Sequence, residues 1–180
     1  MDAVERWFGE GFGRLDPMLQ KLHRHAGKLH GEVAIAYGRG LAGWLGRRIA
    51  TRLGLPRDAM HVPMRVYIHS DNTALHWERR FGDGPVMRSV FTPSGHWPDG
   101  HWLEQTGALR LVLRVDTADG GWRWLPVASS LRGIPLPRVV VPRVEAGKCV
   151  EAGRYRFHVT VSLAPLGLLF GYAGLLSPTG

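Results

Sequence analysis

Hydrophobic and polar residues alternate with a period of two over most of the chain from Val62 onward. The alternating segments are short, and Gly, Pro, Asp and Asn residues separate them, which is typical of antiparallel hairpins. One earlier segment alternates in the same way. The pattern predicts strands at residues 33–37, 62–69, 73–81, 86–92, 101–106, 108–116, 121–129, 153–162 and 167–175.

Two segments before Val62 follow the helical period instead. Asp16 can cap free backbone N–H groups and Pro17 suits the first helical position, which predicts a helix over residues 16–23. A second helix is predicted over residues 41–53, with an apolar face of Leu41, Trp44, Leu45, Ile49 and Leu53. The other side carries Arg47, Arg48 and Arg52, as an interfacial membrane helix would, but Ala42, Gly43, Gly46 and Ala50 favour close packing on a sheet.

These elements predict an α+β, mainly β fold, in which about eight to nine antiparallel strands form a strongly curved sheet or barrel. A flat sheet of this size would leave its edges and one wide face uncovered, so curvature or closure is expected. The two short N-terminal helices should cover one side or end. Because no linker or internal repeat divides the strands, residues 1–180 are expected to form a single domain.

The first hairpin permits a prediction of register. Asp71 and Asn72 tolerate a left-handed backbone and therefore suit a two-residue turn. Such a turn pairs Val66 with Trp77 across the two strands. At the C-terminus, Tyr155, Phe157, Val159 and Val161 should point inward, and the last strand, ending near Leu176, should pair antiparallel with theirs.

Composition indicates which binding partners and which cellular compartment to expect. The net charge is +8, but 20 of the 23 basic residues are arginines spread along the chain, which indicates composition bias rather than a nucleic-acid or membrane surface. The single cysteine, Cys149, cannot form an intramolecular disulfide, and no signal peptide or bilayer-length apolar segment is present. We therefore expect a basic cytoplasmic protein in which membrane or nucleic-acid binding is not favoured.

Six sequence motifs are spread over most of the chain: Phe12 to Pro17 and on through His23, Leu53 to Pro56, Trp77 to Phe81, Leu103 to Gly107, Gly133 to Pro137, and Leu166 to Tyr172. Together they resemble an uncharacterised bacterial domain family that occurs alone or appended to short-chain-dehydrogenase-like Rossmann domains. The resemblance implies a compact stand-alone domain and a Rossmann-domain protein as a candidate partner, and it implies no catalytic residue.

The strongest candidate site follows from alternation, which places Trp77, Arg79 and Phe81 on one strand face. That face should be buried, and a buried guanidinium without a partner costs several kcal/mol. Glu104, which shares a face with Trp102 on another strand, is the carboxylate expected to pair with Arg79. These five residues form the predicted ligand-binding site, bordering whatever space the sheet encloses.

Other chemistry is weakly indicated. His23, His25 and His30 lie close together, but their spacing matches no metal motif, so helix C-terminal capping is the favoured role for His23 or His25. Cys149 is expected in a turn with no histidine nearby in sequence, and no nucleophile elbow is present. No metal or cofactor is therefore predicted.

The leading functional hypothesis is a binding domain that encloses an apolar or partly anionic small molecule, such as a lipid. One alternative is an enzyme that uses Glu104 or His23 as acid or base beside Arg79. Another alternative is peripheral binding to anionic membranes or nucleic acid through the arginine-rich surface.

Overall fold

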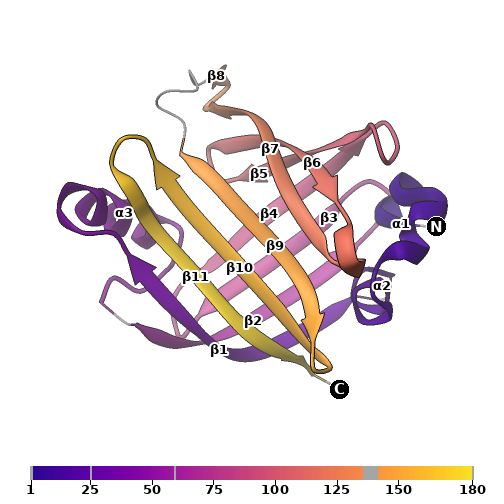
Figure 1. Cartoon of the computed structure of the whole chain (residues 1–180), viewed down its shortest axis with the longest axis horizontal. Coiled ribbons are helices and arrows are strands. Elements are labelled where there is room, and N and C mark those ends of the chain that lie inside the picture. The colour runs from indigo at the N-terminus through magenta and orange to yellow at the C-terminus, as the bar shows by residue number, and fades with distance from the viewer. Residues whose placement is uncertain (1, 25, 59, 136–141, 180) are drawn as a thin grey trace.

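The computed structural model describes residues 2–24, 26–58, 60–135 and 142–179. Its strands wind into an antiparallel barrel, with helices α1 and α2 at one end and α3 at the other (Figure 1). The helical elements are α1 (Ala3–Phe8), η1 (Gly9–Arg14), α2 (Pro17–Arg24), α3 (Gly40–Arg52) and η2 (Ala118–Gly120). The strands are β1 (Gly27–Tyr37), β2 (His61–Ser70), β3 (Leu75–Phe81), β4 (Val86–Ser94), β5 (His101–Thr106), β6 (Leu109–Asp116), β7 (Trp122–Leu131), β8 (Ile134–Pro135), β9 (Arg143–Glu151), β10 (Arg154–Leu163) and β11 (Gly167–Pro178).

Ten strands form the barrel, and every neighbouring pair is antiparallel. The order is β6-β5-β4-β3-β2-β1-β11-β10-β9-β7, and pairing of β6 with β7 closes the ring, while β8 extends β7 as a short hairpin. The predicted mainly β fold with a barrel is confirmed, with more strands than expected. β9 is the long strand that the alternation did not predict, because a lysine, Lys148, occupies one of its inward positions.

The barrel interior is the hydrophobic core, and the C-terminal strands contribute to it as expected. Tyr155 is 1% exposed and Phe157 is 7% exposed, and β11 pairs antiparallel with β10, bringing Tyr155 opposite Leu176. β11 also pairs with β1, so the last strand joins the two halves of the barrel.

The first hairpin has a register two residues away from the prediction, because Val66 pairs with Arg79 rather than with Trp77. The Asp71 side chain is the cause. Its carboxylate accepts hydrogen bonds from the backbone N–H groups of Thr73 (2.6 Å) and Ala74 (2.8 Å), which stabilises a four-residue turn in place of the expected two-residue turn. A shift of two residues leaves each side chain on its predicted face.

Aromatic side chains pack at the barrel end beside α1 and α2. Trp7 of α1 contacts Trp102 with ring centroids 5.3 Å apart, and Phe8 contacts Trp122 at 4.9 Å. Helix α1 was not predicted, although Asp2 accepts hydrogen bonds from two backbone N–H groups of its first turn, the usual N-cap signal. This end of the barrel is therefore closed by a packed aromatic layer.

At the other end, α3 packs against β11 through its small residues, as expected. A side chain at Gly46 would collide with the backbone carbonyl of Leu169, so the two backbones approach closely. Because α3 packs through its small residues, part of its predicted apolar face points toward solvent. The Leu41 side chain is 64% exposed and that of Trp44 is 52% exposed. In the part of the chain that the structure describes, no helix is long and apolar enough to cross a bilayer.

Candidate functional site

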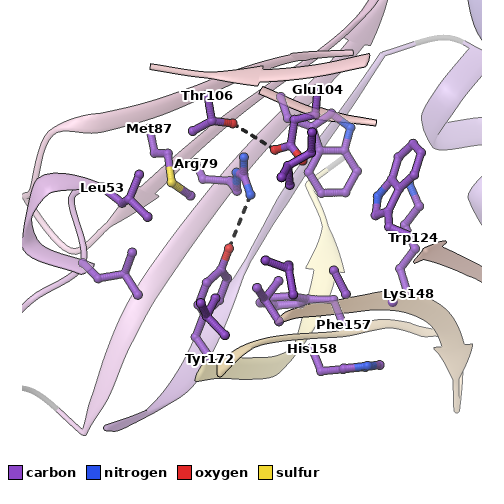
Figure 2. Close-up of a pocket in the computed structure, with 18 of the residues that line it drawn as sticks. Leu53, Arg79, Met87, Glu104, Thr106, Trp124, Lys148, Phe157, His158 and Tyr172 are labelled. Atoms are coloured by element: carbon purple, nitrogen blue, oxygen red, sulfur yellow. Dashed lines mark hydrogen bonds between the residues drawn. The ribbon is translucent and has the colours of Figure 1, made fainter. Parts of the chain in front are cut away.

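A cavity of about 130 Å³ lies inside the barrel, with most of its wall apolar (Figure 2). It extends from Leu53, just after α3, toward Trp124 and Lys148 on the side of the aromatic layer. Apolar lining residues include Leu53, Met87, Phe91, Leu111, Phe157 and Phe170, and the polar ones include Arg79, Glu104, Thr106, Lys148, Tyr155 and Tyr172.

Arg79 is buried in this wall, at 8% exposure, as the alternation of β3 predicts. Its guanidinium donates to the hydroxyl of Tyr172 at 3.3 Å and to the hydroxyl of Ser89. Among the described residues no carboxylate lies within 4.0 Å of it. The predicted ion pair with Glu104 is therefore wrong: two neutral hydroxyl groups occupy the positions expected for a carboxylate.

Glu104 nevertheless lines the same cavity as Arg79, on the neighbouring part of the wall. Its carboxylate accepts a hydrogen bond from the hydroxyl of Thr106 at 2.9 Å, and Thr106 is hydrogen-bonded to Ser89, which in turn contacts Arg79. The two charges are connected through two hydroxyl groups instead of directly. The guanidinium consequently keeps a positive charge that no adjacent carboxylate neutralises.

The other predicted site residues divide between the cavity and the packing around it. Trp77 lines the cavity beside Arg79, whose guanidinium carbon lies 5.7 Å from the Trp77 ring centroid. Phe81 packs edge-on against Tyr172 at 5.2 Å and is outside the lining. Trp102 is fully buried in the aromatic layer with Trp7 and is likewise outside it.

Three buried polar atoms on lining residues lack a hydrogen-bond partner within the described part of the chain. They are Nε of Arg79, Nε1 of Trp77 and the hydroxyl oxygen of Tyr155. Burial raises the pKa of Tyr155 well above its ordinary value, so its phenol retains a proton to donate. Buried donors are normally satisfied. Three lining residues therefore each carry a donor without a partner, whereas among the described lining residues Glu104 is the single carboxylate.

Lys148 is a charged lining residue that the sequence analysis missed. Alternation along β9 points its side chain inward, where it is 4% exposed and its amine lies 2.7 Å from Nε2 of His23. The amine also lies 3.7 Å from the ring centroid of Trp122 and 4.4 Å from that of Trp77. The alternation of Val144, Ala146, Lys148 and Val150 was the available signal.

His23 bridges α2 to this lysine. Its Nδ1 hydrogen-bonds the carbonyl oxygen of Leu19, one turn earlier in the same helix, at 2.7 Å from a fully buried position, so capping of the helix C-terminus by His23 stays a prediction. Burial and the adjacent Lys148 hold the pKa of His23 well below its ordinary value, and burial lowers the pKa of Lys148. His25 lies outside the described residues.

One other predicted feature differs in the structure. Cys149 lies within β9, exposed on the outer face, and not in a turn. Over residues 2–24, 26–58, 60–135 and 142–179, no cluster of three or more His, Cys, Asp or Glu side chains could hold a metal ion.

A cleft of about 830 Å³ adjoins the cavity where β7 and β9 separate. These strands pair over only three residue pairs, from Trp122 opposite Lys148 to Trp124 opposite Ala146. Both Trp124 and Ala146 line the cavity as well as the cleft, and Arg123 and Arg143 line the cleft alone. Arg123 is ion-paired with Asp116 at 3.5 Å and Arg143 with Glu145 at 3.0 Å, so the interior is bordered by a cleft whose arginines are charge-paired.

Comparison with known proteins finds a family model that matches most of the chain. The family model "Domain of unknown function (DUF4166)" matches residues 15–176, which include every lining residue named above. A comparison with curated proteins finds no match.

Proposed function

The chain belongs to the DUF4166 family, a domain of unknown function, and we propose from its cavity that the barrel binds an apolar small molecule bearing an anionic group. Arg79 carries this proposal. It is a buried guanidinium in a mostly apolar wall, its hydrogen-bond partners among the described side chains are two hydroxyl groups, and its Nε is unpartnered. An anionic oxygen of a ligand would supply the missing acceptor and the missing charge.

The volumes of the cavity and of the adjoining cleft suit a small ligand whose chain extends from one into the other. The interior cavity, at about 130 Å³, resembles an engineered cavity of about 150 Å³ that binds benzene. A longer chain would need to extend toward the cleft between β7 and β9, whose lining includes the apolar side chains of Leu125 and Val127. A medium-chain carboxylic acid such as octanoate is therefore a suitable probe.

Octanoate is expected to bind more tightly than octanol, which has the same chain without the charge. Arg79→Met should weaken octanoate binding about 10- to 100-fold and leave octanol binding nearly unchanged, since a hydrogen bond to a charged group contributes about 1.5–3 kcal/mol. Titration calorimetry, or fluorescence of the tryptophans around the cavity, measures both affinities.

Arg80→Met is the matched control, because Arg80 is the next residue of β3 and its side chain is exposed on the outer face. This variant should bind octanoate like the unmodified protein. Equal affinities for octanoate and octanol, or equal effects of the two substitutions, would contradict the proposal.

Peripheral binding to anionic membranes is a second candidate, favoured by one observation on α3. Leu41 and Trp44 are both more than half exposed, and the guanidinium of Arg48 lies 5.1 Å from the Trp44 ring centroid. Apolar side chains flanked by arginines suit the boundary between anionic headgroups and acyl chains. Because Leu53, at the end of this segment, lines the cavity, membrane contact would bring the lipid phase close to the proposed binding site.

Leu41→Ser/Trp44→Ser should reduce binding to phosphatidylglycerol vesicles at least tenfold, since each apolar side chain contributes about 1–3 kcal/mol when it leaves water. Co-sedimentation with these vesicles and with neutral phosphatidylcholine vesicles measures the effect. Leu125→Ser/Val127→Ser, which changes two comparably exposed side chains on β7, should leave binding intact. Absence of vesicle binding, or equal losses in both variants, would exclude α3 as a membrane contact.

An enzyme with Glu104 or His23 as acid or base has weaker support. Glu104 lines the cavity, but its carboxylate is separated from Arg79 by two hydroxyl groups, and His23 reaches the lining only through Lys148. A Rossmann-domain partner stays a prediction from the family resemblance.

A further inference from the structure

The buried amine of Lys148 has surroundings that differ from those of an ordinary lysine. Its hydrogen-bond partner is a histidine ring, its other close neighbours are indole rings, and no described carboxylate lies within 4.0 Å. The side chain lines the same cavity as Arg79. Within the described residues this lysine therefore serves no ion pair, and its side chain borders the space that a ligand would occupy.

The hydrogen bonds define the direction of proton donation between Lys148 and His23. The carbonyl oxygen of Leu19 can only accept, so Nδ1 of His23 carries the ring proton and Nε2 has a free lone pair. The Lys148 amine therefore donates to Nε2 at 2.7 Å. Nε2 is placed to receive a proton from the amine nitrogen.

Burial and the aromatic rings act in opposite directions on this amine. A cation–π contact stabilises an ammonium, whereas burial without a counterion destabilises it. Desolvation is the larger effect, and it lowers the pKa of Lys148. A neutral amine retains the lone pair that makes lysine a nucleophile toward carbonyl groups.

We propose that Lys148 forms an imine with an apolar aldehyde or ketone that enters the barrel cavity. The inference rests on the proposed function, because the carbonyl compound must occupy the same apolar space. It also fits the rest of the wall, since the free donors of Arg79, Trp77 and Tyr155 suit a ligand with further acceptor oxygens.

The reaction is balanced by the groups in place. The amine lone pair forms a bond to the carbonyl carbon, and the π electrons of the C=O bond move to oxygen. Nε2 of His23 accepts the two amine protons one after the other and delivers each to the oxygen, which leaves as one water molecule as the C=N bond forms. No oxidant or reductant is required. The apolar wall then disfavours hydrolysis of the imine by limiting access of water.

Reductive trapping tests this inference, and the small number of lysines makes the labelled position easy to assign. The chain has three lysines, of which Lys21 and Lys28 are exposed. Octanal and cyanoborohydride at about pH 7, where exposed lysines are protonated, should place one octyl group on Lys148, at least tenfold ahead of the other two. Peptide mass spectrometry locates the group. In Lys21→Arg/Lys28→Arg, Lys148 is the remaining side-chain amine, and its labelling should be unchanged.

Two variants separate chemistry from binding. Lys148→Arg, with a cooperative thermal transition to show that it folds, should lose the adduct, and His23→Gln should slow trapping while Lys148 remains the labelled residue. Labelling of Lys21 and Lys28 at the same rate as Lys148 would overturn the inference. If that happens while octanoate still binds in an Arg79-dependent manner, only the imine is refuted. If neither octanal nor octanoate binds, the proposed function is refuted too.

Discussion

A chain that ends at Leu163 is expected to show no cooperative thermal unfolding. This change removes β11, which forms nine residue pairs with β1 and nine with β10 and so closes the barrel. It also removes Leu169, Phe170, Tyr172 and Leu176, all buried. Burial of four such side chains contributes roughly 6–12 kcal/mol, comparable to the whole stability of a typical domain.

Circular dichroism during heating measures this effect. A chain ending at Pro178 is the matched control, because it keeps all of β11 and should melt like the full-length protein. A sharp transition for the shorter chain, near that of the full-length protein, would mean that the barrel does not depend on its last strand.

Stability is expected to rise with pH from the folded-state pKa of Lys148 up to the ordinary pKa of lysine, 10.5. In this range the unfolded chain protonates this lysine, while burial keeps the pKa in the folded state well below 10.5. The unfolded state then binds one more proton, so the free energy of unfolding increases with pH by up to about 1.4 kcal/mol per unit. Lys148→Met should abolish that slope.

His23 should add a second slope at lower pH. Its folded-state pKa lies well below the ordinary 6.5, so from pH 6.5 down to the folded-state value the unfolded chain again binds the extra proton. Stability therefore falls further as the solution is acidified through this window.

Urea unfolding at several pH values from about 5 to about 10 measures both slopes. Lys28→Met provides the control, because Lys28 is exposed and its removal should leave the slope as it is. If the slope between neutral pH and pH 10.5 is the same in Lys148→Met and in the unmodified protein, Lys148 is charged in the folded state. The slope is more informative than the absolute stability, since methionine also leaves Nε2 of His23 without its donor.

Local alternation along the strands predicted several residues in and around the candidate site. Alternation along β3 placed Trp77, Arg79 and Phe81 inside, and alternation along β5 did the same for Glu104. The partner of Arg79 could not be read in this way, because Tyr172 lies 93 residues away on the opposite wall. A face assignment says which side chains point inward, but it does not give distances across a barrel.

The sequence by itself determined the mainly β class, the positions of most strands and helices, and the burial of Arg79, because period-two and helical patterns are local properties. Tertiary structure decided the rest. It decided closure by β6 and β7, the inward position of Lys148 on β9, and the contact of that amine with His23, 125 residues away. A lysine on an otherwise apolar face is a local exception that only the surrounding walls explain: they bury the amine beside a histidine and three indole rings.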